Sequence, residues 1–305
     1  MFDWDAVIIG GGPAGLTAGL YLARANRRVI LIEKENFGGF PKNVEWIENY
    51  PGFPDGISGA QLANNMLTQA QKYGLQTEAG EVTTIELFSS TRWVGTSSGK
   101  GYTTGVVIIA GGSRPKKLGV PGEEQLMGKG IIHCALCDGG QFANKPVAVC
   151  GGGDAGVTEA LYLAKLGSRV TLIEFMPRLT ASAILQDRAR GKMDVRTGTK
   201  VESIIGKDKV EAVECVEIAT GLKKTLQVDG VLVHVGLDPN TGYLDGTVPL
   251  DKTRQVIVDA RMQSEVPYVL ACGDIRSGSV RQISAAVGDG AVAGITAQRL
   301  LQEME

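Results

Sequence analysis

The sequence has no long apolar run and no excess of charge of one sign. No stretch approaches the roughly 18 consecutive apolar residues of a membrane-spanning helix, and 31 basic side chains are balanced by 33 acidic ones. Binding to nucleic acid usually requires a strongly basic surface. We therefore expect neither a membrane nor nucleic acid among the partners of this protein.

Cysteine is also sparse. The chain has five cysteines, and an odd number in a chain of this length argues against an extracellular disulfide framework. The first apolar strand is expected at residues 6–9, which leaves no room for a signal peptide before it. We therefore expect a cytoplasmic protein. Three further cysteines, Cys150, Cys215 and Cys272, are expected to be buried small apolar residues, because each lies in or beside an apolar strand.

Glycine, by contrast, is abundant. The 42 glycines among 305 residues cluster as GG and GGG between apolar runs and do not form a linker. Such clusters indicate tight turns and close approach of the backbone to a ligand. The chain is also longer than one hydrophobic core usually serves, so two domains are expected.

An internal repeat defines the layout. Residues 7–33 align without a gap with residues 148–174, at an offset of 141. Each copy has a short apolar strand, a glycine turn, a helix with apolar positions three and four residues apart, and a second strand that ends in glutamate. The repeat predicts an α/β fold with two Rossmann-like dinucleotide-binding domains.

The first glycine turn has the dinucleotide-binding pattern G-x-G-x-x-G. Gly10 permits the turn, Gly12 lets the backbone approach a pyrophosphate, and Gly15 allows the helix to pack on the strand. Glu33 ends the second strand, where a carboxylate accepts hydrogen bonds from a ribose. A glycine turn without a ligand is the alternative, but strand, helix and terminal acid together favour a bound nucleotide.

The second copy repeats this pattern with Gly151, Gly153, Gly156 and Glu174. A 2′-phosphate would require arginines just after the second strand, whereas residues 174–178 read EFMPR, and the carboxylate of Glu174 repels a phosphate. Charge therefore favours NADH over NADPH. A site that binds no nicotinamide nucleotide remains the alternative.

Cys134 and Cys137 form a C-x-x-C motif between the two nucleotide motifs. This spacing suits a disulfide that opens and closes, especially where a helix start stabilises the first thiolate. A zinc site is the alternative, but zinc would need two further ligands. Asp138 could protonate a leaving thiolate or cap the next turn, and His133 could relay a proton or simply pack.

The motifs together resemble a known family. The stretches GGGPAGLTAGLYLAR, ENYPGFP, CALCDGG, GGGDAG, LDPNT, CGDIR and RQISAAVGDGAVAG occur in this order along the whole chain. In content and order the chain resembles the low-molecular-weight thioredoxin reductases. This resemblance implies two Rossmann-like (three-layer ββα) domains: an FAD domain of residues 1–115 and 246–305, and a central domain of residues 116–245 that carries the disulfide.

The resemblance also implies roles. Cys137 would face the flavin, Cys134 would attack the disulfide of thioredoxin or a similar protein, and Asp138 would act as the acid. Rotation of the central domain would let the cysteine pair alternate between flavin and substrate in a homodimer. The residues expected around FAD are Gly10, Gly12, Pro13, Ala14, Gly15, Glu33, Gly39, Phe40, Asn49, Ala110, Gly111, Gly273, Asp274, Arg281, Gln282 and Ile283.

Three departures from the family pattern affect the electron path. EFMPR replaces the usual H-R-R motif, Phe40 replaces a glutamine near the flavin, and Gly111 replaces a threonine. The donor is therefore left open among NADH, NADPH, ferredoxin and another flavin. Two other functions remain as alternatives: a flavin-dependent oxidase of a small dithiol, and a non-catalytic redox-sensing flavoprotein.

Overall fold

A computed structural model describes residues 2–304 of the chain. By its internal contacts the chain divides into two compact units. Unit 1 comprises Met1–Arg114 and Pro239–Glu305, and unit 2 comprises Pro115–Asp238. In residues 2–304, no helix is both long enough and apolar enough to span a membrane.

Unit 1 is built on one mixed sheet in the order β3-β2-β1-β6-β5-β4, with β17 also paired to β6. The pairs among β3, β2, β1, β6 and β17 are parallel, whereas β4 and β5 form an antiparallel extension. Its strands are β1 (Trp4–Ile9), β2 (Val29–Glu33), β3 (Gln76–Ala79), β4 (Val82–Leu87), β5 (Arg92–Thr96), β6 (Gly101–Ile109) and β17 (Val269–Ala271).

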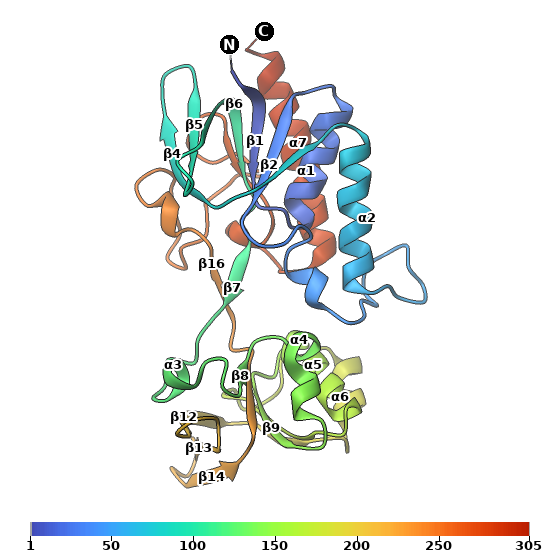
Figure 1. Ribbon diagram of the computed structural model, residues 1–305, viewed down its shortest axis with the longest axis vertical. Helices are drawn as coiled ribbons and strands as arrows, with labels where there is room; N and C mark the ends of the chain where they lie inside the picture. The colour runs from blue at the N-terminus through green and yellow to red at the C-terminus, as the bar shows by residue number, and fades with distance from the viewer. Residues whose placement is uncertain (1, 305) are drawn as a thin grey trace. The chain divides into compact units, whose positions relative to one another are not determined.

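Three helices cover one face of this sheet (Figure 1): α1 (Pro13–Arg24), α2 (Gly59–Lys72) and α7 (Ile283–Gln302). One core cluster packs beneath these helices and includes Ile8, Leu31 and Ile108. The alternate residues of the same strands, among them Val7, Ile30 and Val107, pack on the opposite face with residues of β4, β5 and the 244–256 segment. Both faces of the sheet are buried, which accounts for the continuous apolar runs in β1 and β2.

The last strand and helix belong to unit 1. β17 pairs in parallel with the end of β6, and α7 packs along α1. Two glycines allow the helices this close approach: a Cβ at Gly290 would meet the Ala14 carbonyl, and one at Gly294 would lie 2.9 Å from Cβ of Tyr21. The two ends of the chain therefore share one core, although some 250 residues separate them.

Unit 2 has a five-stranded parallel sheet in the order β11-β10-β9-β15-β8, and a separate antiparallel sheet β12-β13-β14. The βαβ repeat is present as β9, α5 and β10, matching β1, α1 and β2. Its elements are α3 (Glu123–Leu126), β8 (Ile131–Ile132), α4 (Ala135–Asp138), β9 (Pro146–Cys150), α5 (Asp154–Lys165), β10 (Arg169–Ile173), α6 (Ala183–Ala189), β11 (Asp194–Arg196), β12 (Thr199–Ile205), β13 (Ala212–Glu217), β14 (Lys223–Gln227) and β15 (Gly230–Val233).

After β15, a short strand β16 (Leu237–Pro239) follows and pairs with β7 (Ser113–Pro115). The second unit boundary falls after Asp238 instead of near residue 245. The physical reason is burial: Leu244 is fully buried and packs with the core of unit 1.

Candidate active site and cofactor sites

The glycine turn of unit 1 requires glycine on steric grounds. Gly10 has φ of +107°, and a Cβ there would collide with the carbonyl of Ala110. Gly39 (φ +62°) lies against Gly12, and the neighbouring Gly38 donates its N–H to the Gly11 carbonyl at 2.7 Å. The glycines thus leave the backbone without side chains where α1 begins, and Pro13 is the first residue of that helix. A helix start of this kind suits a pyrophosphate.

Glu33 contacts the same glycine turn through its carboxylate. Its carboxylate accepts the Gly11 N–H at 2.6 Å and the Glu35 N–H at 2.8 Å. These bonds fix the carboxylate while leaving oxygen lone pairs for a ribose hydroxyl. A small cavity starts beside it, at the carboxyl ends of β1 and β6, where the strand order reverses and α/β sheets bind ligands. Its lining includes Ile9, Gly10, Ile32, Glu33, Lys34, Gly80, Glu81, Val82, Gly111, Asn240 and Tyr243.

Tyr243 provides an independent sign of a ligand at this cavity. Its hydroxyl is buried and has no hydrogen-bond partner among residues 2–304, and burial raises its pKa well above the ordinary value. A buried hydroxyl without a partner costs roughly 1–3 kcal/mol, which a polar ligand group would offset. Asn240 lies beside it and donates its side-chain N–H to the Gly111 carbonyl at 2.8 Å.

The turn after β17 lies against the start of α1, because a Cβ at Gly273 would lie 2.8 Å from Cβ of Ala14. Gly273 has φ of +79°, and burial raises the pKa of the Asp274 carboxyl above its usual range. Asp289, on α7, accepts the Gly273 N–H at 3.1 Å and pairs with both Nε and Nη2 of Arg276, at 2.7 and 2.8 Å. This buried ion pair fixes the Gly273–Asp274 turn at the end of the sheet.

The remaining expected flavin contacts lie at the start of α7 and on the loop after β2. The Asn49 amide donates to the side-chain oxygen of Gln282 at 3.1 Å, although these residues are 233 positions apart. Arg281 adopts a left-handed φ of +55° just before Ile283 begins α7, and Phe40 is 41% exposed. All sixteen expected residues therefore lie in unit 1. The glycine cradle, the fixed carboxylate of Glu33 and the unpartnered Tyr243 hydroxyl fit FAD.

Unit 2 repeats the glycine turn with matching detail. Gly151 has φ of +118°, and a Cβ there would collide with the carbonyl of His234. Both carboxylate oxygens of the buried Glu174 are bonded to backbone, one to the Gly152 N–H at 2.5 Å and the other to the Met176 N–H at 2.7 Å. The turn has the same local geometry as its counterpart in unit 1, so the residues present fit a second dinucleotide.

The residues after Glu174 are exposed and mostly apolar. Phe175 is 59% and Met176 48% exposed. Arginine at these positions could pair with a 2′-phosphate, whereas phenylalanine and methionine cannot. The shape of the site therefore suits a dinucleotide, but its charge does not select a phosphorylated ribose.

Cys134 and Cys137 form a disulfide with a Cα–Cα distance of 5.4 Å. Cys134 is the N-cap of α4, and its Sγ accepts the backbone N–H of Cys137 at 3.1 Å. Cys137 is exposed and Cys134 partly exposed. Because the N–H donation favours a thiolate on Cys134, the first cysteine is suited to nucleophilic attack once the disulfide is opened.

Asp138 and His133 flank the cysteine pair in the sequence. Asp138 is exposed and makes no side-chain cap to the turn that follows it, so the capping alternative lacks its hydrogen bond. The Nδ1 of His133 lies 3.4 Å from the Val233 carbonyl. Since both cysteine sulfurs are in the disulfide, they do not serve as zinc ligands here, and residues 2–304 contain no cluster of three His, Cys, Asp or Glu side chains suited to a metal.

The other three cysteines are buried, as the sequence predicted. Burial raises the pKa of the Cys215 thiol to about 11, and it raises the pKa values of Cys150 and Cys272 even further. A thiol with a raised pKa is a poor nucleophile at neutral pH. The reactive sulfur chemistry of the described chain is therefore confined to the Cys134–Cys137 pair.

Sequence reasoning missed several residues that shape these sites: Asn240, Tyr243, Arg276, Asp289, Glu159 and His234. Asn240, Arg276 and Asp289 lie within the motifs LDPNT, CGDIR and RQISAAVGDGAVAG, so a local signal existed for them. Glu159 and His234 carried no such signal. Their pairing depends on contact between a helix and a strand end that are 75 residues apart in the sequence.

Comparisons with known proteins agree with this architecture. Residues 4–290 match the family model for the pyridine nucleotide-disulphide oxidoreductases. The thioredoxin reductase of Listeria innocua is 39% identical over 99% of this chain and 95% of its own length, and that of Treponema pallidum is 38% identical over 99% of both chains.

Solved structures give the same result. The thioredoxin reductase of Lactococcus lactis superposes with a TM-score of 0.96 at 36% identity, covering 99% of this chain and all of that one. The thioredoxin reductase of T. acidophilum gives 0.93 at 34% identity, covering 99% and 98%. The chain therefore belongs to the pyridine nucleotide-disulphide oxidoreductase family and is a flavoprotein disulfide oxidoreductase of the low-molecular-weight thioredoxin reductase class.

Proposed function

We propose that this protein reduces the disulfide of thioredoxin or a thioredoxin-like protein. The observation that carries the proposal is the Cys134–Cys137 disulfide at the start of α4, with Cys137 exposed, in a chain whose unit 1 fits FAD. The relatives named above are thioredoxin reductases, which supports this choice of substrate. A direct test is reduction of thioredoxin disulfide by the FAD-loaded protein, followed with a thiol reagent.

In the proposed reaction, the Cys134–Cys137 disulfide opens to a dithiol with two electrons that FAD would supply when bound. The Cys134 thiolate then attacks a sulfur of the substrate disulfide, breaking that bond and forming a mixed disulfide. Cys137 attacks Cys134 in turn, which restores the enzyme disulfide and releases the substrate as a dithiol. Asp138 would donate a proton to a leaving thiolate, and Cys137 would be the sulfur that exchanges electrons with the flavin.

The residues proposed to hold FAD are those that unit 1 gathers at the carboxyl end of its sheet. Gly10, Gly12 and Gly15 would bring the backbone to the pyrophosphate, and Glu33 would accept a ribose hydroxyl. The Gly273–Asp274 turn and the start of α7 would bind the flavin half of the cofactor. In unit 2, Gly151, Gly153, Gly156 and Glu174 hold a pyridine nucleotide in the same manner.

For the electron donor we propose NADH in preference to NADPH. Anaerobic addition of NADH should bleach the flavin absorbance at least about tenfold faster than NADPH at equal concentration, because Glu174 repels a 2′-phosphate and the exposed Phe175 and Met176 cannot bind one. Stopped-flow absorbance measures both rates. Faster bleaching by NADPH would contradict the prediction. No bleaching by either nucleotide would indicate another donor, such as reduced ferredoxin or a second flavin.

Introducing arginine after Glu174 should shift the preference from NADH toward NADPH. The double substitution Phe175→Arg and Met176→Arg should raise the rate with NADPH about tenfold or more relative to NADH, because two cations would then face the 2′-phosphate. Both side chains are exposed, so the change should not disturb the core. Ile184→Arg is the matched control, since it adds a cation at another exposed position of unit 2 and should leave the ratio unchanged.

A second candidate function is oxidation of a small dithiol, with oxygen receiving the electrons from the flavin. The absence of arginine at positions 174–177 favours it, because an oxidase needs no nicotinamide nucleotide. An oxygen electrode distinguishes the two functions. Rapid oxygen uptake with a small dithiol, together with no bleaching by NADH or NADPH, would support the oxidase.

We also propose that the protein is a homodimer in the cytoplasm. The proposal follows from the resemblance to its family and from the scarcity of cysteine beyond the redox pair. Light scattering coupled to size exclusion should give twice the chain mass, and a monomer mass would contradict the proposal.

A further inference from the structure

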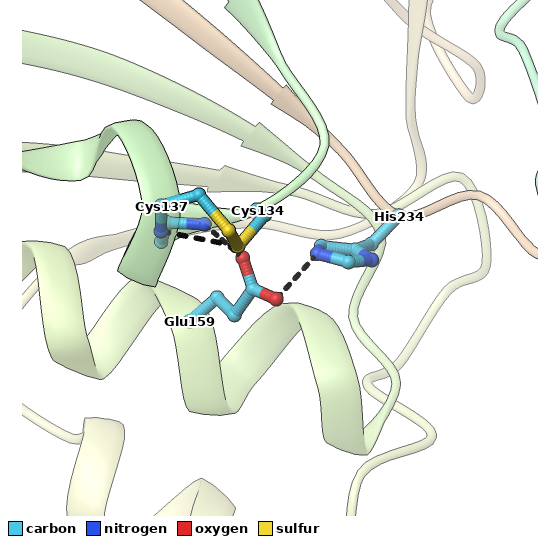
Figure 2. Close-up of a disulfide and its surroundings, with 5 residues drawn as sticks. Cys134, Cys137, Glu159 and His234 are labelled. Carbon is cyan, nitrogen blue, oxygen red and sulfur yellow. Dashed lines mark hydrogen bonds and ion pairs between the residues drawn. A yellow bond between two sulfur atoms is a disulfide. The ribbon is translucent and has the colours of Figure 1, made fainter. Parts of the chain in front are cut away.

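A buried acid–base pair lies beside the redox disulfide in unit 2. Glu159, on α5, accepts the N–H of Ala135 at 2.5 Å with one carboxylate oxygen, and its other oxygen lies 3.2 Å from Nε2 of His234. Ala135 is the residue directly after Cys134. Figure 2 shows Glu159 between the disulfide and His234. Their side chains are only 16% and 6% exposed.

The repeat shows that the fold does not need this pair. In the first copy of the repeat, 141 residues earlier, the residue that aligns with Glu159 is Ala18, and Ala18 is fully buried. His234 corresponds to Ala110: each follows a parallel strand and donates its N–H to the end of the neighbouring strand, His234 to Cys150 at 2.7 Å and Ala110 to Ile9 at 2.8 Å. Two buried alanines in unit 1 are thus replaced by glutamate and histidine in unit 2.

Replacing two buried alanines by glutamate and histidine costs folding free energy, and a function of the pair would account for that cost. Burying ionisable groups is expensive, and an apolar pair of suitable size often serves stability equally well. Unit 1 is built without such a pair at the same place, and the redox disulfide is present in unit 2 alone. The position of the pair, against the first residue of the disulfide helix, points to a function at Cys134.

We infer that Glu159 and His234 are positioning residues that set the charge felt by the Cys134 sulfur. A carboxylate at Glu159, bonded to the residue after Cys134, opposes formation of a thiolate on Cys134. The imidazole of His234, with its Nε2 3.2 Å from that carboxylate, offsets part of this effect.

Other ionisable groups lie near the pair, and the experiment must distinguish their effects from those of Glu159 and His234. His133 approaches from the segment before α4, with its Nδ1 near the carbonyl of Val233, and Asp138 ends α4. Cys150, at the end of β9, is buried with a raised pKa and stays a neutral thiol. Lys116 lies near Gly236, which follows β15: a Cβ added at Gly236 would lie 4.0 Å from Cδ of Lys116.

The experiment measures ionisation of Cys134 directly. In FAD-loaded protein carrying Cys137→Ser, Cys134 is the accessible thiol, because the remaining three cysteines are buried. The hydrogen bond from the backbone N–H of residue 137 is preserved in this variant. The rate of alkylation by iodoacetamide, measured by mass spectrometry from pH 5 to 10, gives the midpoint of thiolate formation.

The two partners should have opposite effects. Glu159→Gln keeps the size and the oxygen that bonds Ala135 but removes the charge, so it should lower the midpoint by about one pH unit. His234→Asn removes the imidazole that lies 3.2 Å from the Glu159 carboxylate, and losing this neighbour should raise the midpoint. Glu159→Asp, which keeps the charge, should lie nearer the parent protein than Glu159→Gln does. Glu202→Gln, on β12, is the matched control and should cause no shift.

Several results would overturn the inference. A merely structural role predicts that Glu159→Gln behaves like the parent and Glu159→Asp does not. Shifts of the same sign in Glu159→Gln and His234→Asn, or no shift in either, would also reject it. A shift in His133→Gln that is absent from His234→Asn would assign the effect to the other histidine. The inference rests on the proposed function of the disulfide, but alkylation needs neither donor nor protein substrate, so either can fail without the other.

Discussion

Cys134→Ser is expected to lower the turnover of thioredoxin disulfide by at least about a thousandfold, because the nucleophile of the exchange is lost. Cys134 is suited to that role by its place at the N-cap of α4, where its sulfur accepts the N–H of residue 137. Flavin reduction by the donor should continue, because it does not require the disulfide. Turnover is measured with a thiol reagent, and flavin reduction by anaerobic absorbance.

The same variant tests which cysteine faces the flavin. With Cys134 replaced, Cys137 is a free thiol, and its thiolate should give a long-wavelength absorbance band with oxidised flavin. Cys137→Ser should lose turnover to a similar extent but show no such band. A band in Cys137→Ser instead would reverse the assignment of the two cysteines. Cys215→Ala, in a buried position on β13, is the control and should retain turnover.

Asp289→Ala should destabilise unit 1 by about 3–5 kcal/mol, because removing one member of a buried ion pair leaves the other charge without a partner. Asp289 is 7% exposed, pairs with Arg276 through two hydrogen bonds and accepts the N–H of Gly273. All three interactions are lost together. The Gly273–Asp274 turn then loses its support at the proposed flavin site, so affinity for FAD should fall as well.

Urea unfolding followed by flavin fluorescence reports on unit 1 directly. Asp245→Ala provides the comparison, because it removes an Asp–Arg pair of the same unit whose side chains are 61% and 53% exposed. That change should cost less than about 1 kcal/mol. Equal losses for the two variants would show that the buried pair contributes no more than a surface pair.

Much of the architecture could be predicted from local sequence. The glycine turns at Gly10 and Gly151 require positive φ, and Glu33 ends one buried strand while Glu174 directly follows the other. These features follow from chain stereochemistry and short-range patterns, which the repeat displays twice. The cysteine pair was equally visible, because a C-x-x-C motif contains its own geometric constraint.

The contacts between distant segments could not be predicted in this way. Tyr243 reaches the cavity beside Gly10 only because residues 239–250 pack on the sheet of unit 1. The resemblance placed the second boundary near residue 245, whereas the chain divides after Asp238. Leu244, between these positions, reads as an ordinary apolar residue in either unit. Its burial depends on which sheet covers it.

The sequence by itself determined the two βαβ units, the two glycine turns and the redox-active pair, because each depends on residues within about thirty positions of one another. Only the tertiary structure decided which side chains meet at those sites. Strand pairing brings His234 beside Gly151, the packing of α5 brings Glu159 to the residue after Cys134, and the return of α7 brings Asp289 to Gly273. These contacts arise from strand register and helix packing across the whole chain, which no local pattern encodes.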